Sequence, residues 1–211
     1  SSLKIMSPKE VIFEGGREVN IESDKMQEKF YVYGPKGVEN ITSSSSIAVK
    51  EAYELSGSVV DAAGNYIWKK GTVYARNQIM AITGTKKDTE NSSLAVCLDT
   101  ILELEGISRK TQPMLNAGEG AIYILSNMLR QEKVLDLRGC PLDTVLYYLD
   151  QDIPVLAMMN NQDAYLITGF NEYNVVLMDP KTGNVFKKGM KDSRAMFEEN
   201  GNQFITYMRY E

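Results

Sequence analysis

The chain has 211 residues, 43% hydrophobic and 24% charged, enough for one large domain or for a domain with a smaller lobe. Its net charge of -5 argues against a nucleic-acid partner, because neutralising phosphates requires a basic face. No apolar run approaches the roughly 20 residues that cross a bilayer, and two cysteines are too few for a disulfide framework or a zinc site.

The N-terminal region is predicted to be rich in strands. The sequence opens with Ser1 and Ser2 rather than with methionine, and we expect it to be a fragment of a longer protein. Short runs of branched and aromatic residues, separated by Gly- and Pro-containing turns, then predict strands. These runs cover residues 3–6, 11–13, 18–21 and 30–33.

A helix and a hairpin follow. The serines at 43–46 precede an apolar run and are typical of a helix N-cap, so a helix is predicted over residues 47–55, ended by Gly57. Residues 58–69 are predicted to form strand, turn and strand. The strand at 30–33, the helix and the hairpin make a unit of about 45 residues, which we expect to be too small to fold alone and to lean on the rest of the chain. Residues 1–85 are predicted to form a small N-terminal α+β lobe.

Tyr66 and the single tryptophan, Trp68, lie one residue apart on the second of these strands. Because side chains alternate between the two faces of a strand, both should point to the same face. Tyr31 and Tyr33 have the same two-residue spacing. The pair either fills a seam between two lobes or forms a platform on which a sugar or peptide stacks.

Residues 91–106 predict a buried helix around which the chain is organised. Asn91 and Ser92 are alternative N-caps, and Gly106 stands where a left-handed C-terminal cap is expected. The apolar residues of the helix recur at the 3.6-residue period and form one stripe. The stripe consists of Leu94, Cys97, Leu98, Ile101 and Leu102.

The remaining elements alternate between helices and strands, as an α+β domain does. Residues 164–167 and 175–178 predict a two-stranded hairpin because they are short runs of branched and aromatic residues. Residues 185–186 should pair back through the turn at 181–184. Helices are predicted over 117–130, 141–151 and 192–200, and a closing strand over 204–208.

A helix followed by this hairpin resembles the papain-like cysteine peptidases, in which a central helix packs on an antiparallel sheet. Residues 86–211 are similar to the bacteriocin-processing (double-glycine) branch. DAYLITGF at 163–170 resembles that family's His-Ala-x-Leu-Ile-x-Gly-Tyr strand, and DIPV at 152–155 resembles its Gly-x-Pro-Val. The resemblance implies an α+β, papain-like fold over residues 86–211, with the small N-terminal lobe at 1–85.

The family's catalytic positions map onto four residues of this chain. Ser93 stands where the nucleophilic Cys opens the helix, Asp163 where the His opens the strand, and Asp179 at the third member of the triad. Lys87 takes the place of the oxyanion-hole Gln. Only Asp179 keeps the residue type of the family. If the resemblance holds, Ser93, Asp163 and Asp179 should converge in one site.

The chain contains no histidine. A Cys or Ser nucleophile of this type is activated by a base that takes its proton near neutral pH, usually an imidazole, and an ordinary carboxylate is far too weak a base. Cys97 lies on the apolar stripe of the helix and is predicted to be a buried hydrophobe rather than a reactive thiol. We therefore expect no catalytic residue, no metal and no cofactor.

These observations predict a non-catalytic, peptidase-like domain, a pseudopeptidase. We expect it to bind an extended peptide or protein segment, or to be structural, within a larger bacterial surface or secretion-linked protein, and to be extracellular or cell-surface. Two alternatives remain. One is a hydrolase with an atypical site of Ser93, Asp163 and Asp179, and the other is an adhesion module that uses the face of Tyr66 and Trp68.

Overall fold

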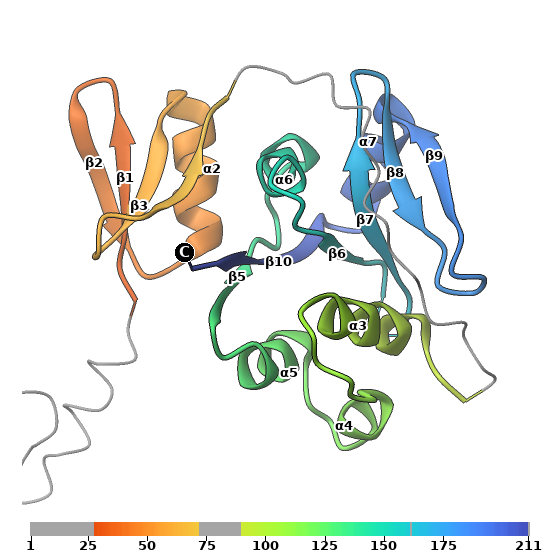
Figure 1. Ribbon diagram of the computed structural model, residues 1–211. Coiled ribbons are helices and arrows are strands. Elements are labelled where there is room, and N and C mark those ends of the chain that lie inside the picture. The colour runs from red at the N-terminus through yellow and green to blue at the C-terminus, as the bar shows by residue number, and fades with distance from the viewer. Residues whose placement is uncertain (1–27, 72–89, 161, 211) are drawn as a thin grey trace, which may run out of the picture.

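The structure is a computed structural model that describes residues 28–71, 90–160 and 162–210 (Figure 1). The strands predicted at 3–6, 11–13 and 18–21 lie outside the described residues. The described chain is α+β, with two antiparallel sheets and the helices packed on them. None of its helices is both long and apolar enough to span a membrane.

The N-terminal lobe is a four-stranded antiparallel sheet with one helix, α2, against it (Figure 1). The strand order is β2-β1-β3-β4, and the pairing of β3 with β4 contains a register shift. The predicted helix and hairpin are confirmed, whereas β2 was not predicted. The bounds are β1 Phe30–Gly34, β2 Gly37–Thr42, α2 Ser45–Leu55, β3 Ser58–Asp61 and β4 Tyr66–Lys69.

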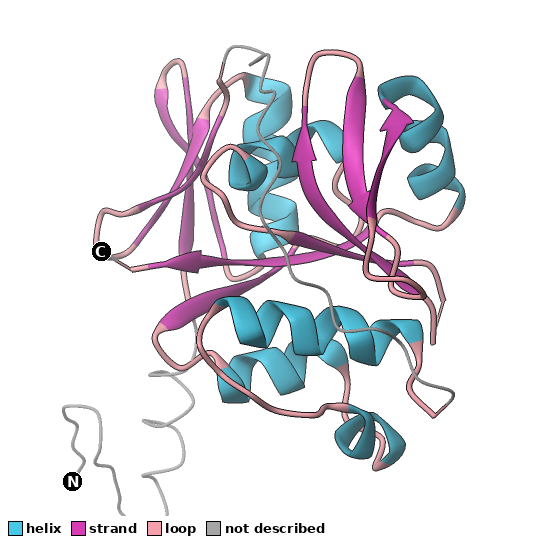
Figure 2. Ribbon diagram, turned by 45° about the vertical axis from the view of Figure 1, so that its right-hand side comes forward, coloured by secondary structure: helices cyan, strands magenta, loops and turns pink. Residues whose placement is uncertain are grey.

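The larger part of the chain is built on a six-stranded antiparallel sheet of order β5-β10-β6-β7-β8-β9. Helices α3 and α5 pack on one side of this sheet, and α6 and α7 on the other (Figure 2). The strands are β5 Glu132–Asp136, β6 Val155–Met158, β7 Ala164–Phe170, β8 Asn174–Met178, β9 Val185–Gly189 and β10 Gln203–Arg209. The helices are α3 Ser93–Leu104, α4 Gln112–Asn116, α5 Ala121–Met128, α6 Leu142–Leu149 and α7 Met190–Glu199.

The central helix α3 forms where its sequence predicts it. The Ser92 hydroxyl caps its start by accepting a hydrogen bond from the Ala95 amide at 3.1 Å, and Gly106 follows its end with a left-handed φ of 82°. All five residues of the predicted stripe are buried. Because α3 packs on β6 and β7 and precedes them in the chain, the helix-first arrangement expected of a papain-like fold is present.

Two elements of this region differ from the prediction. The helix predicted over residues 117–130 forms only as α5. Residues 117–120 are instead a loop between α4 and α5, because Gly118 adopts a φ of 91° and Gly120 is the N-cap of α5. Strand β5 was not predicted, because its sequence EKVLD has only two apolar residues. Its pairing with β10 places it at the edge of the sheet.

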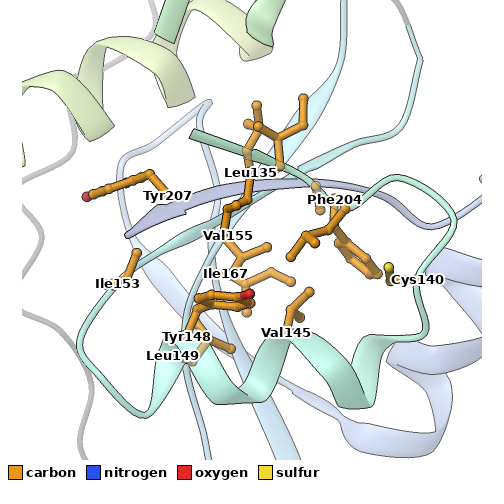
Figure 3. Packing of buried hydrophobic residues seen from close by; sticks show 14 of the residues in the cluster. Leu135, Cys140, Val145, Tyr148, Leu149, Ile153, Val155, Ile167, Phe204 and Tyr207 are labelled. Atoms are coloured by element: carbon orange, nitrogen blue, oxygen red, sulfur yellow. The ribbon is translucent and has the colours of Figure 1, made fainter. Parts of the chain in front are cut away.

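A seam of buried side chains joins the N-terminal lobe to α6. The Trp68 indole donates a hydrogen bond to the Thr144 carbonyl at 2.9 Å, and the Tyr148 hydroxyl donates one to the Ile67 carbonyl at 2.8 Å. Tyr148 also stands in the apolar core that α6 shares with the six-stranded sheet (Figure 3). The two sheets therefore share one continuous core.

A buried ion pair crosses the same boundary. The Lys133 ammonium on β5 lies 3.3 Å from Asp61 on β3 and 3.0 Å from Glu28, and the Lys133 and Asp61 side chains are 8% and 7% exposed. The ammonium also lies 5.7 Å from the ring of Phe30 and 5.8 Å from that of Tyr210. Both the start and the end of the described chain thus meet at this lysine.

Candidate functional site

The three positions singled out by the sequence line a single pocket, which we call the Ser93 pocket. Its volume is about 350 Å³. Ser93 begins α3, Asp163 directly precedes β7, and Asp179 directly follows β8, so the structure brings together residues from distant parts of the chain. The described residues that line it are Ser93, Met159, Asp163, Ala164, Tyr165, Asp179, Pro180, Lys181 and Met196.

Ser93 is held in the first turn of α3 by contacts of its neighbours. The Ser92 amide donates to the Gln112 side chain at 2.6 Å, and the Leu94 amide donates to the Gln162 carbonyl at 3.0 Å. Ser93 itself is only 4% exposed, and no residue in the described part of the chain hydrogen-bonds to its hydroxyl. Among the described side chains only Asn202 Oδ1 is buried without a partner, so the Ser93 hydroxyl is open to the pocket, where water or a ligand can bond to it.

Both aspartates have one carboxylate oxygen engaged by a local turn. Asp163 Oδ2 accepts a hydrogen bond from the Asn160 side-chain amide at 2.9 Å, and Asp179 Oδ1 accepts one from the Lys181 backbone amide at 2.9 Å. Among the described residues, no donor reaches Asp163 Oδ1 or Asp179 Oδ2, and neither carboxylate is hydrogen-bonded to Ser93. The pocket is therefore acidic and has unused acceptors.

Proton abstraction from Ser93 would need a base in contact with its hydroxyl. The chain has no imidazole, and the Ser93 hydroxyl donates to no described side chain. In the described ranges no three His, Cys, Asp or Glu side chains are grouped so that they could hold a metal ion. The geometry suits the binding of a hydrogen-bond donor, whereas nucleophilic catalysis requires the nucleophile to contact its base.

Neither thiol offers another nucleophile. Cys97 is fully buried, as predicted, and burial, together with Asp179 and Asp99, raises the pKa of its thiol. Cys140 is also fully buried, and burial raises the pKa of its thiol to about 12. A raised pKa disfavours the thiolate, which is the reactive form.

Of two further positions of the resemblance, the structure describes one. Lys87, at the oxyanion position, lies outside the described residues. Asp152, where the family has Gly, has a φ of 62°, the left-handed region that favours glycine. The backbone at Asp152 thus has a conformation that glycine adopts more readily than aspartate does.

The stacking platform predicted from Tyr66 and Trp68 is not formed. Tyr66 is 52% exposed whereas Trp68 is 2% exposed. Val59 pairs with Trp68 and Val60 with Tyr66, so Ile67 is an extra, bulged residue and the alternation of the strand is interrupted. Trp68 fills the seam between the lobes, which was the first of the two expectations for this pair.

Sequence reasoning missed the apolar wall of the Ser93 pocket. Met159, Tyr165, Pro180 and Met196 supply this wall, and Phe186 stacks edge-on against Tyr165 with ring centroids 6.2 Å apart. Tyr165 and Pro180 adjoin motif residues, whereas Met196 reaches the pocket only because α7 packs on β8 and β9. That packing has no signal in the local sequence.

A second hollow adjoins the Ser93 pocket. It has a volume of about 680 Å³ and lies between the start of α3, the loop that precedes α5 and the end of β6. Met159 lines both hollows. Ser93 lines the first, and Leu94, the next residue in the chain, lines the second. The two hollows therefore lie side by side around the first turn of α3.

No model of a known protein family matches the chain, and no curated protein matches it. Among solved structures, the chain is similar to the crystal structure of a candidate C39-like peptidase from Bacillus anthracis. The sequence identity is 14%, the TM-score is 0.47, and the match covers 66% of this chain and 95% of that chain. This likeness transfers neither an activity nor a partner to this chain.

Proposed function

We propose that this chain is a non-catalytic, peptidase-like module that binds an extended peptide or protein segment. The observation that carries the proposal is the Ser93 pocket, where Ser93, Asp163 and Asp179 converge in a chain without histidine. The positions at which the resemblance places a triad are in reach of one ligand. The group that would activate the nucleophile is missing.

The shape of the site supports an extended ligand. Together the two hollows around Met159 provide an apolar wall beside polar groups, as binding sites for flexible ligands commonly do. The Ser93 pocket alone has room for one side chain, and the neighbouring hollow could take the residues beside it. We extend the proposal to a role within a larger bacterial surface or secretion-linked protein, which rests on the resemblance alone.

The test restores the chemistry that the family resemblance implies. In the double variant Ser93→Cys, Asp163→His, a thiol and an imidazole occupy the positions of nucleophile and base. We expect a short peptide vinyl sulfone to label this variant faster than it labels the parent, measured by intact-protein mass spectrometry. The background should be low because both native thiols are buried and the pKa of each is raised.

The single variant Ser93→Cys is the matched control, because it has the thiol without the added base. N-ethylmaleimide, which has no peptide part, separates general thiol reactivity from recognition of the peptide. For each reagent, the labelling rate of the double variant is divided by that of the single variant. If this ratio is the same for the peptide vinyl sulfone and for N-ethylmaleimide, the peptide-binding proposal is wrong. A covalent adduct of a fluorophosphonate on Ser93 of the parent would instead support the atypical hydrolase.

A further inference from the structure

We infer that the Ser93 pocket accepts a primary ammonium group of its peptide ligand. This inference rests on the proposed function, since it concerns the same pocket, and it adds the chemical class of the group recognised. The pocket presents three acceptors to which no described residue donates a hydrogen bond: Ser93 Oγ, Asp163 Oδ1 and Asp179 Oδ2. A primary ammonium has three donors and no acceptor, so the two sets match.

The charge of the lining favours a cation. Among the described residues, two carboxylates and one ammonium, that of Lys181, line the pocket, and Lys181 forms no ion pair with Asp163 or Asp179. The start of α3 contributes a partial positive charge that opposes a cation, but this is only about half an elementary charge. The two carboxylates and the Lys181 ammonium sum to a net charge of -1, which still outweighs it.

The arrangement of acceptors favours an ammonium over a guanidinium. A guanidinium binds most strongly when both oxygens of one carboxylate accept from its planar fork. Here one oxygen of each carboxylate already accepts a hydrogen bond within a turn. Asp163 accepts from Asn160, and Asp179 accepts from Lys181. Single oxygens on separate elements suit a compact ammonium whose three N–H bonds point in different directions.

The Ser93 residue, nearly buried with its hydroxyl open to the pocket, is an independent indication of a ligand. Ser93 is 96% buried, which follows from its 4% exposure, and its hydroxyl lines the pocket with no described partner. A donor from the ligand would satisfy it. Beside it, Met159, Tyr165 and Met196 form an apolar surface for the carbon chain that carries the amine.

Two parts of a peptide carry a primary ammonium: a lysine side chain and the amino terminus. Four matched amides separate them. Nα-acetyl-lysine methylamide has only the side-chain amine, and leucine methylamide has only the α-amine. Nα,Nε-diacetyl-lysine methylamide and Nα-acetyl-leucine methylamide have none. Binding is measured by the shifts of the ¹H–¹⁵N resonances of the first turn of α3 as each amide is titrated.

We expect at least one amine to bind about fivefold more tightly than its acetylated partner. The amide that shows this preference identifies the source. Asp163→Asn should remove the preference, because it removes one charge at an exposed position. Lys181→Met should increase it, because the competing ammonium is gone.

Equal binding of all four amides would overturn the ammonium inference and leave the peptide-binding proposal standing. Absence of shifts for both amines would overturn the ammonium inference as well. The vinyl sulfone experiment then decides separately whether the pocket binds peptides. A preference that survives in Asp163→Asn would also count against the inference, since the amine would then be recognised elsewhere.

Discussion

At the scale of single residues, burial decides what the two cysteines can do. Cys97 has no hydrogen-bond partner in the described part of the chain, whereas the Cys140 thiol donates to the Ser46 carbonyl at 3.5 Å. Both side chains are fully buried. Replacing each with serine therefore compares the same substitution at a thiol without a hydrogen-bond partner and at a thiol with one.

Cys97→Ser should lower the free energy of unfolding by about 1–3 kcal/mol, because the new hydroxyl is buried without a partner other than the helix backbone. Cys140→Ser should cost less, because its hydroxyl retains the Ser46 carbonyl as an acceptor. Urea denaturation of both variants measures the difference. An unchanged stability in Cys97→Ser would contradict the environment described for this residue.

Single residues also show how much of the site can be predicted from the sequence. Ser93, Asp163 and Asp179 were found through the resemblance to known motifs. Ser93 lies at the start of a helix and Asp163 directly before a strand, and the local sequence predicts both of these starts. Met196 was not found, because its place in the pocket depends on how α7 sits on the sheet. A contact between distant elements leaves no mark in either element's own sequence.

At the scale of elements, helix ends are the features that the sequence predicted best. Gly106→Ala should destabilise the protein by about 1–2 kcal/mol, because φ is 82° there while no atom lies within 4 Å of the added methyl group. The cost is therefore one of backbone conformation. Thermal denaturation followed by circular dichroism measures it.

Gly120 provides the comparison for Gly106. It caps α5 with a φ of -86° and also has open space around its Cα. Gly120→Ser should be neutral or stabilising by up to about 1 kcal/mol, since serine is a favourable N-cap. Equal losses in Gly106→Ala and Gly120→Ser would show that backbone conformation is not the cause.

The strands were predicted less well than the helix ends, and for a physical reason. The strands β2 and β5 lie at sheet edges and contain charged residues, so their own apolar pattern is weak. The bulge at Ile67 depends on the partner strand β3 and reverses the face of Tyr66 relative to Trp68. Alternation along one strand cannot reveal a shift in its pairing.

At the scale of the whole molecule, Trp68 reports on the seam between the lobes. It is the single tryptophan and is 2% exposed, so its emission should be blue-shifted and resistant to iodide. We expect its fluorescence and the far-UV circular dichroism to show the same urea midpoint, because the two sheets share one core. A fluorescence change at lower urea would mean that the N-terminal lobe separates first.

The ion pair between Lys133 and Asp61 should make the seam sensitive to pH. Burial opposes the charged form of Asp61, but hydrogen bonds from Asn65 and the charge of Lys133 lower its pKa on balance. Burial likewise opposes the charge of Lys133, but Glu28 and Asp61 raise its pKa. The pair therefore stabilises the fold most between about pH 4 and pH 10.

Lys133→Met should lower the free energy of unfolding by about 3 kcal/mol near neutral pH, because Asp61 remains buried without its cation. The difference in free energy of unfolding between the parent and the variant should become smaller as pH falls through the lowered pKa of Asp61. It should narrow again as pH rises through the raised pKa of Lys133. Denaturation curves across this range measure the gap, and Lys36→Met removes an exposed lysine as a control.

The turn at Asp179 has a consequence for protein engineering. Its carboxylate is oriented by the Lys181 amide, and its carbonyl accepts from the Thr182 and Gly183 amides at 3.2 and 2.7 Å. The orientation of the Asp179 carboxylate is thus fixed by the hairpin itself, without a hydrogen bond from another described side chain. A designer who installs a thiol at position 93 and an imidazole at position 163 would therefore keep this carboxylate in place by leaving the turn at residues 179–184 unchanged.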